Sequence, residues 1–267
     1  MQIKELVNAV RKIPKSISSE REIYPGAIEE RRGFLWKPML VIGGLVFAGS
    51  SKVWSQSSGS KSSLDGNDLD FNSFFNECSA LANAAAKNEN LNEEDHLCRL
   101  LSFVSRLRLQ AVPTAKLGLF AGINPPIEFG PIKVSSPLSI IQWKLAPNAV
   151  LPAHNHNPAD IVSVCLEGET LVRHFDLEGP APEYSSTQTF RIRETRSDVL
   201  TPGRVSTLTQ RRDNIHTFIA GDNGALGMDV NSFLPGNKPF SFLDYSSKPI
   251  DPKRRVYEAV WRKIASA

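Results

Sequence analysis

Hydrophobic residues between positions 70 and 110 recur with the three-to-four-residue spacing of amphipathic helices. They form two groups, with members Phe74, Phe75, Leu81 and Ala85 in the first and Leu97, Leu100, Leu101, Val104 and Leu107 in the second. Asp70 or Asn72 is suited to cap the first helix, and the acidic residues 93–95 begin the second after a polar break. The pattern predicts two helices that pack on the outside of a larger domain.

From residue 111 onward the pattern changes to short apolar segments separated by Gly, Pro and Asp turns. These segments are 140–145, 161–166, 170–176, 188–193, 204–209, 216–220 and 225–233. Segments of this length are typical of an antiparallel barrel. We therefore expect a mainly β protein, a jelly-roll β-barrel with a short N-terminal helical segment. Further on, Tyr257, Trp261 and Ile264 share one helical face, which predicts a C-terminal helix docked on the barrel.

The N-terminal part of the chain carries a different pattern. Arg31 and Arg32 precede Phe34 and Leu35, and a short apolar run follows from Met39 to Ala48. Paired arginines before such a run resemble a twin-arginine export signal. The run is short for a membrane span, which needs about 20 residues. We expect export or membrane anchoring, with membrane contact, through residues 30–48. A presequence is the alternative, and the location would otherwise be cytoplasmic or organellar.

These patterns divide the chain into regions. Residues 1–54 are the signal or anchor segment, and the Ser/Gly-rich residues 55–69 are a flexible linker. Residues 70–110 are the helical prelude, residues 111–250 the barrel, and residues 251–267 a C-terminal tail.

Composition narrows the classes of protein that fit. A chain of 267 residues with 41% hydrophobic residues can bury one good-sized core and carry a tail. The net charge of +3 gives no indication of nucleic-acid binding. Cys78, Cys98 and Cys165 lack CxxC spacing and are odd in number, which argues against a disulfide framework and zinc-finger chemistry. Cys165 alternates within an apolar strand, so we interpret it as a small core residue.

A candidate metal site follows the predicted strand at 140–145. His154 and His156 are separated by one residue, and on one strand such side chains point to the same face. A third ligand should come from a later strand. His216 is the best candidate, because it opens an apolar strand after a polar turn, whereas His174 is interpreted as a surface or core residue. His96 lies in a polar helical segment and is interpreted as solvated. A buried core histidine is the alternative interpretation for each.

The order of these motifs resembles the cupin superfamily and, more narrowly, the thiol dioxygenases of the cysteamine dioxygenase and plant cysteine oxidase family. The matching residues are His154-Asn155-His156, Gly168, Leu171–Asp176, Asn214-Ile215-His216, Met228-Asp229-Val230 and Pro235. The resemblance covers roughly residues 110–250. The chain departs from the family pattern at two places. Asn157-Pro158 replaces the Pro-Gly that usually follows the second histidine, and Asp160 falls where other cupins have an acidic ligand.

The resemblance implies an Fe(II) centre held by His154, His156 and His216. It implies a dioxygenase that adds both atoms of O2 to the sulfur of a small aminothiol or an N-terminal cysteine, giving a sulfinic acid. Asp229 would then hydrogen-bond the amine of the substrate or the oxygen that reacts with it. A structural carboxylate paired with a nearby arginine is the alternative interpretation of Asp229.

Several alternatives are open at this stage. If Asp160 joins the three histidines, the chain fits another cupin oxygenase or isomerase with a non-thiol substrate. We favour an Asp160 that points to solvent or caps the turn after Asn157-Pro158. A non-enzymatic cupin that serves for binding or storage is a further alternative. The arginines downstream are interpreted as a solvated face, with an anionic-substrate site as the alternative; they are Arg191, Arg193, Arg196, Arg211 and Arg212. The sequence indicates neither the particular thiol nor the oligomeric state.

Overall fold

The computed structural model describes residues 68–120, 123–156, 158–184, 186–235 and 240–262. The expected signal or anchor segment and most of the expected linker lie outside these residues. Asn157 and Ile264 lie outside them as well. Within the described ranges, no helix is both long enough and apolar enough to cross a membrane.

Two helices precede the sheet, as the sequence predicts. Helix α3 spans Phe71–Ala85 and helix α4 spans Glu93–Val104, and a short 3₁₀ turn, η1, follows at Leu109–Ala111. The Asp70 carboxylate caps α3 by accepting a hydrogen bond from the Ser73 backbone N–H at 2.8 Å. The Asn92 side chain caps α4 in the same manner. The acidic residues of the first turn of α4 also interact favourably with the helix dipole.

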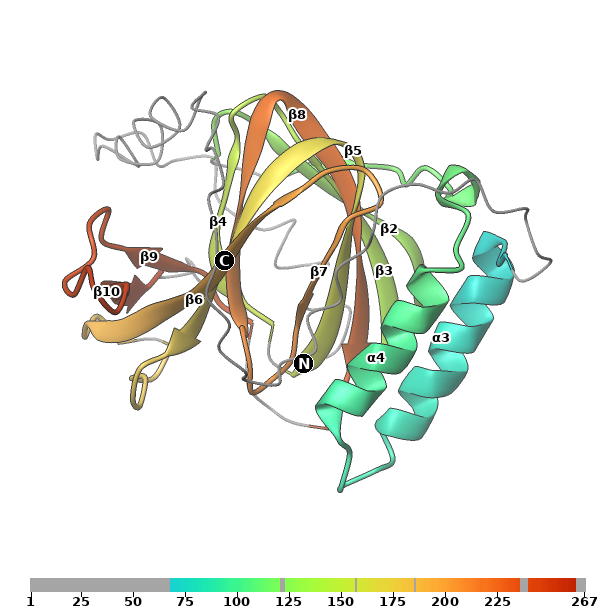
Figure 1. The fold of residues 1–267 in the computed structure, drawn as a ribbon, viewed down its shortest axis with the longest axis horizontal. Helices are drawn as coiled ribbons and strands as arrows, with labels where there is room; N and C mark the ends of the chain where they lie inside the picture. The colour runs from blue at the N-terminus through green and yellow to red at the C-terminus, as the bar shows by residue number, and fades with distance from the viewer. Residues whose placement is uncertain (1–67, 121–122, 157, 185, 236–239, 263–267) are drawn as a thin grey trace, which may run out of the picture.

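The rest of the described chain forms a 10-stranded sheet in which every recorded pairing is antiparallel. The strands are β1 (Gly118–Leu119), β2 (Ile127–Ser135), β3 (Leu138–Leu145), β4 (Val150–Asn155), β5 (Ala159–Leu177), β6 (Phe190–Leu200), β7 (Val205–Leu208), β8 (Ile215–Phe233), β9 (Leu243–Tyr245) and β10 (Val256–Trp261). Their order is β1-β2-β3-β8-β5-β6-β10-β9, with β4 paired to β8 and β7 to β5. The sheet curls strongly on itself (Figure 1). The predicted mainly β barrel with a helical segment before it is therefore confirmed.

The two longest strands, β5 and β8, explain the curl. Each was predicted as two shorter strands, but each continues through its expected break with shifts of register near Gly168. Gly168 has a φ of 71°, and a Cβ atom there would lie 2.2 Å from the Gly224 carbonyl oxygen. Only glycine tolerates this approach at a positive φ. The glycine therefore bends the paired strands instead of ending the first one.

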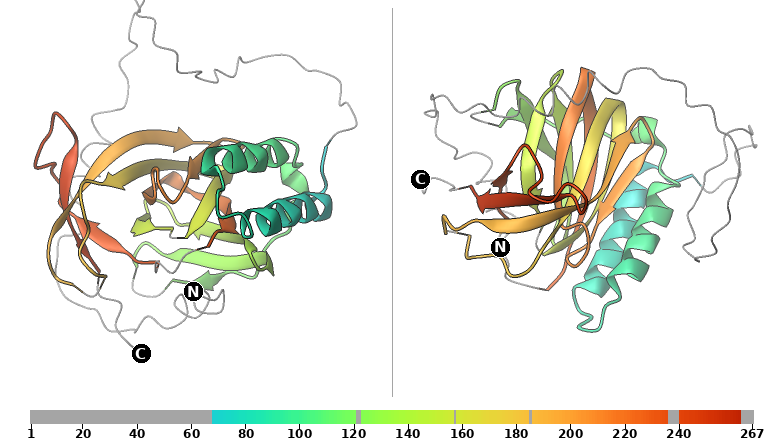
Figure 2. Two further views of the ribbon diagram at one scale, coloured as in Figure 1. Left: turned by 90° about the horizontal axis from the view of Figure 1, so that it is seen from below. Right: turned by 60° about the vertical axis from the view of Figure 1, so that its left-hand side comes forward.

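The helices cover one outer face of the barrel. Their apolar residues form one buried cluster with residues of β3, β5 and β8, including Ile140, Val162 and Val230. Figures 1 and 2 show α3 and α4 side by side on this face, with the β9–β10 pair on the opposite side of the barrel. A second cluster fills the barrel interior and contains Trp143 and Phe218. The strands between the two clusters are therefore buried on both faces.

Two predictions about buried residues were wrong. His96 was expected to be solvated, but it is 2% exposed, and its Nε2 lies 2.9 Å from the Ser232 hydroxyl oxygen. It occupies the same face of α4 as Leu97 and Leu100, which packs on the barrel. Leu69, placed in the expected linker, is buried in the helix–barrel cluster.

The C-terminal residues form a strand and not the predicted helix. Tyr257 and Trp261 lie on β10, which pairs with β6 and β9. Their spacing of four residues fits one face of a strand as well as one face of a helix. The side chains of Tyr257 and Trp261 are nevertheless buried, in a cluster with Phe190 and Ile192.

The expected arginine face is only partly solvated. Arg191, Arg193 and Arg211 are exposed, whereas Arg196 and Arg212 are half-buried. Arg212 donates to Glu94 of α4 at 2.7 Å and to Asp213 at 2.6 Å. It therefore connects the helices to the barrel as an ion-pair partner.

Leu100 tests the packing of α4 on the barrel. It is fully buried, so Leu100→Ala leaves a cavity and should lower the free energy of unfolding by about 2–5 kcal/mol. Leu119→Ala is the control, since Leu119 is 67% exposed and its removal should change stability by about 0.5 kcal/mol or less. Urea denaturation measures both. Equal effects of the two substitutions would contradict the packing described here.

Candidate metal centre

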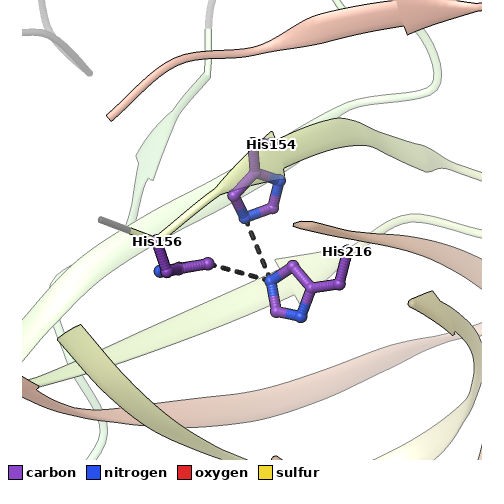
Figure 3. Close-up of side chains that lie close together, drawn as sticks. All are labelled: His154, His156 and His216. Carbon is purple, nitrogen blue, oxygen red and sulfur yellow. Dashed lines mark hydrogen bonds between the residues drawn. The ribbon is translucent and has the colours of Figure 1, made fainter. Parts of the chain in front are cut away.

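The structure brings the three histidines proposed as metal ligands together. His154, His156 and His216 each offer a ring nitrogen, and these nitrogens lie within 4.8 Å of one another. The Nε2 atoms of His154 and His216 are 3.1 Å apart, and those of His156 and His216 are 2.9 Å apart. Figure 3 shows the three rings converging on one point. In the described ranges, no other group of three His, Cys, Asp or Glu side chains meets this criterion.

Strand register explains the convergence. His154 on β4 is paired directly with His216 at the start of β8, so both side chains point to the same face. His156 comes directly after the end of β4, and its backbone N–H donates to the Asn214 carbonyl at 3.2 Å. The turn before His216 is held by Asp176, whose carboxylate accepts from the Asp213 N–H at 2.6 Å.

Burial keeps the three imidazoles neutral. Loss of hydration lowers the pKa of His154 to about 4 and places the pKa values of His156 and His216 well below the usual value near 6.5. The His154 Nδ1 lies 2.8 Å from the Pro152 carbonyl oxygen, which can only accept. The proton of His154 is therefore on Nδ1, and its Nε2 directs a lone pair into the cluster. Neutral imidazoles with converging lone pairs fit a metal cation.

Aromatic rings line the cluster on two sides. Phe218 packs on His216 with ring centroids 4.6 Å apart. On the other side, the centroids of Phe240 and Phe242 each lie 5.4 Å from that of His154. The centre is therefore enclosed by apolar groups, which limits the access of water to it.

Asp229, the expected catalytic carboxylate, lies in the barrel interior and not among the three histidines. Its Oδ1 accepts a hydrogen bond from the Trp143 Nε1–H at 3.0 Å, and Ser163 stands opposite it on β5. Burial raises the pKa of Asp229 to about 6, although hydrogen bonds from Ser163 and Trp143 favour its charged form. The structure records no ion pair between Asp229 and an arginine of the described residues, so the alternative interpretation of this carboxylate is not supported.

Trp143 links Asp229 to the histidine cluster. Its ring lies 5.1 Å from that of Phe218, which in turn packs on His216. A Cβ atom at Gly227 would lie 2.1 Å from the Trp143 ring, so the indole takes this position only because residue 227 is glycine. The carboxylate and the cluster thus belong to one packed interior.

Asp160 does not join the histidines, and it is not solvated either. It is fully buried on the outer face of β5, towards α4, and neither carboxylate oxygen has a hydrogen-bond partner of good geometry in the described part of the chain. The expectation that it points to solvent or caps a turn was therefore wrong. Burial, followed by the charges of Glu93 and Glu94, raises its pKa to about 8. A site of three histidines plus Asp160 does not form in this arrangement.

His174 is a core histidine, one of the two interpretations that its sequence context allowed. It is paired with His216 across the sheet, with ring centroids 5.8 Å apart, and it is fully buried. Its Nε2 lies 2.6 Å from the Ser206 hydroxyl oxygen and 3.3 Å from Nη2 of Arg196. Because a guanidinium can only donate, this nitrogen accepts and is engaged away from the cluster.

Comparisons with known proteins return only distant structural likenesses. No protein-family model matches the chain, and no curated protein matches it. Among solved structures, KdgF from Halomonas sp. is 20% identical with a TM-score of 0.29, covering 40% of this chain and 79% of that one. Oxalate oxidase in complex with glycolate is 20% identical with a TM-score of 0.28, covering 39% of this chain and 45% of that one.

A third similar structure is an uncharacterized conserved protein with a double-stranded β-helix domain from Klebsiella pneumoniae. It is 13% identical with a TM-score of 0.31, and the match covers 42% of this chain and 80% of that one. At this level of identity the functional inferences rest on the geometry of the chain itself.

Several residues of the site were not singled out from the sequence. Phe240, Phe242 and Trp143 contribute rings, and Asn155 fastens a distant segment to the cluster. The sequence could have pointed to Asn155, because this residue lies between the two histidines of the motif. No local pattern could have pointed to Phe240, because its contact with His154 joins residues far apart in the sequence.

Asp160 gives a prediction about pH. Its pKa is about 8 in the folded chain and near 3.8 when unfolded, so the folded state retains a proton that the unfolded state releases. The Asp160 contribution to stability is therefore complete below about pH 4 and is lost as the pH rises towards 8. Asp160→Asn cannot ionise and so removes this loss. The free energy of unfolding of the variant should therefore exceed that of the original chain by an amount that grows with pH, by at most about 1.4 kcal/mol per pH unit.

Urea denaturation between pH 5 and 9 measures this difference. Asp198→Asn is the control, because it makes the same change of side chain at a position that is 55% exposed. A difference for Asp160→Asn that stays constant over the range would contradict a buried, protonated carboxyl group.

Proposed function

We propose that the chain is an Fe(II)-dependent thiol dioxygenase that converts a small aminothiol or an N-terminal cysteine to the sulfinic acid. The observation that carries this proposal is the cluster of three neutral histidines, two buried and one half-buried, without a carboxylate among them. Neutral ligands leave the full charge of a divalent cation uncompensated. A site with that charge favours an anionic ligand such as a thiolate.

The overall reaction balances without another reductant. A thiol and O2 combine to give one sulfinic acid, so the sulfur loses four electrons and the two oxygen atoms gain them. When bound, the iron would supply open coordination positions at which the thiolate and dioxygen meet, and it would stabilise the thiolate. The remaining tasks belong to the protein, namely to hold the metal, exclude water and orient the substrate.

The chain's own groups are suited to these tasks. The Pro152 carbonyl fixes the orientation of His154, and the direct pairing of β4 with β8 fixes His216 opposite it. The interior cluster around Trp143 and Phe218 excludes water from the side facing the barrel. Asp229 offers a carboxylate that is held by Trp143 and Ser163, and we propose that it accepts a further hydrogen bond from the ammonium group of a substrate.

The position of Asp160 argues against the competing proposal of an oxygenase or isomerase with three histidines and a carboxylate. Its side chain lies near Glu93 and Glu94 of α4, whereas the three histidines lie together around the pairing of β4 with β8. A non-enzymatic cupin would differ from the proposed enzyme in failing to consume oxygen after loading with iron.

Oxygen uptake by the iron-loaded protein tests the activity. Cysteamine, free cysteine and a peptide with an N-terminal cysteine are supplied in parallel, and we expect one of them to gain two oxygen atoms by mass spectrometry. His216→Ala removes a ligand and should abolish both stoichiometric iron and uptake. Bound iron without uptake for any thiol would exclude the proposed reaction, and absence of bound iron would favour a non-enzymatic protein.

Asp229→Asn separates substrate orientation from metal binding. The iron content should be unchanged, because Asp229 is not among the converging ligands, while kcat/KM should fall at least about tenfold. In the original chain kcat/KM should rise with pH through about 6 as the carboxyl group ionises, and this limb should disappear in the variant. Unchanged turnover and an unchanged pH profile would remove Asp229 from the mechanism.

A further inference from the structure

The segment from Phe240 to Phe242 lies directly against two of the three histidines. Phe240 and Phe242 pack edge-to-face with centroids 5.0 Å apart, and the Phe240 centroid lies 5.9 Å from that of His156. Phe242 also forms an isolated β-bridge with His154. We call the two rings the aromatic wall. Phe242 belongs to the interior cluster and Phe240 packs against it, so the wall continues the interior packing up to the histidines.

The residues of the cluster and the wall differ in their exposure. His154 and His216 are 4% and 0% exposed, and Phe242 is 8% exposed. By contrast, His156 and Phe240 are half-buried and reach the surface. On the opposite side, Phe218 and His174 pack on His216. A ligand that approaches the cluster from solvent therefore passes beside the Phe240 ring.

Asn155, between the two histidines of the motif, holds the aromatic wall in place. It is 1% exposed, and its Oδ1 accepts a hydrogen bond from the Ser241 N–H at 2.7 Å. Its own backbone N–H donates to the Ser241 carbonyl at 3.1 Å. Its Nδ2 donates to the Tyr184 hydroxyl at 3.0 Å. Ser241 is the residue between the two phenylalanines, so these bonds set the distance between wall and cluster.

We propose that Phe240 determines which ligands reach the metal centre and that Asn155 is the positioning residue that fixes Phe240. The wall admits slender ligands, such as an unbranched aliphatic thiol, and rejects ligands with a bulky group next to the donor atom. This inference deepens the proposed function and rests on it for the presence of a metal and for the class of ligand. The tests below do not depend on turnover.

The first test measures ligand binding to the protein loaded with Co²⁺, whose visible absorption reports changes in coordination. Azide is the slender probe, and phenylmethanethiol is the bulky one. Phe240→Ala should raise the affinity for phenylmethanethiol at least about tenfold and change that for azide less than about twofold. Asn155→Leu is close in size to the original residue and keeps the backbone bond to the Ser241 carbonyl, but it loses the side-chain bonds to the Ser241 N–H and the Tyr184 hydroxyl. It should therefore shift the ratio of the two affinities in the same direction.

Asn155→Asp is the matched control. A carboxylate can still accept from the Ser241 N–H and can accept from the Tyr184 hydroxyl, so this variant should keep the original ratio. If the ratio of the affinity for phenylmethanethiol to that for azide is unchanged in Phe240→Ala, the role of the wall is overturned. Equal ratios in Asn155→Leu and Asn155→Asp would overturn the role of Asn155. Both affinities are measured without dioxygenase activity. If the protein proved to lack the proposed reaction, the ratio of the two affinities would still test the roles of Phe240 and Asn155.

The second test uses the metal-free protein, so it gives a result even if cobalt does not bind. Diethyl pyrocarbonate modifies accessible neutral imidazoles, and peptide mass spectrometry locates the modified ring. In the metal-free protein, Phe240→Ala should increase the rate of His156 modification at least about threefold, because the ring beside it is removed. Modification at the original rate would show that Phe240 does not limit access to the cluster.

Discussion

Three neutral imidazoles, two of them buried and one half-buried, are the constraint on which the rest of this structure depends. Burial makes protonation costly, so each ring keeps a lone pair, and the Nε2 atoms face one another at 2.9–3.1 Å. Neutral rings packed in this way lack enough protons to satisfy every nitrogen that faces the cluster, and a cation would satisfy them all. The direct pairing of His154 with His216 is therefore the feature that the barrel has to preserve.

The barrel preserves this pairing by supporting its long strands on both sides. Strand β8 carries His216 at one end and Asp229 near the other, and it pairs with β3, β4 and β5 along its length. The helices cover the outer face of the second half of β8, where Met228 and Val230 belong to the helix–barrel cluster. The β9–β10 pair packs at the opposite side (Figure 2). The three histidines, the Asp229 carboxylate and the core are thus parts of one continuous arrangement.

Local patterns explain what the sequence predicted. Helix spacing gave α3 and α4, and the HxH spacing with a later histidine gave a cluster that the structure brings together. The predictions that were wrong, and the contacts that were missed, depended on the direction in which a side chain points or on contacts between residues far apart in the sequence. The face to which Asp160 points is set by the register of β5 after the turn, and a spacing of four residues in Tyr257 and Trp261 suits helix and strand alike. The aromatic wall arises from contacts between β4 and residues 240–242, which no local pattern encodes.

The most direct test of the central claim is the origin of the oxygen atoms in the product. The iron-loaded protein is supplied with oxygen-18 gas in ordinary water, and the thiol product is analysed by mass spectrometry. The proposed dioxygenase predicts a sulfinic acid that carries two labelled atoms, because both come from the same molecule of O2. A product with one labelled atom, or with oxygen taken only from water, would contradict the proposal.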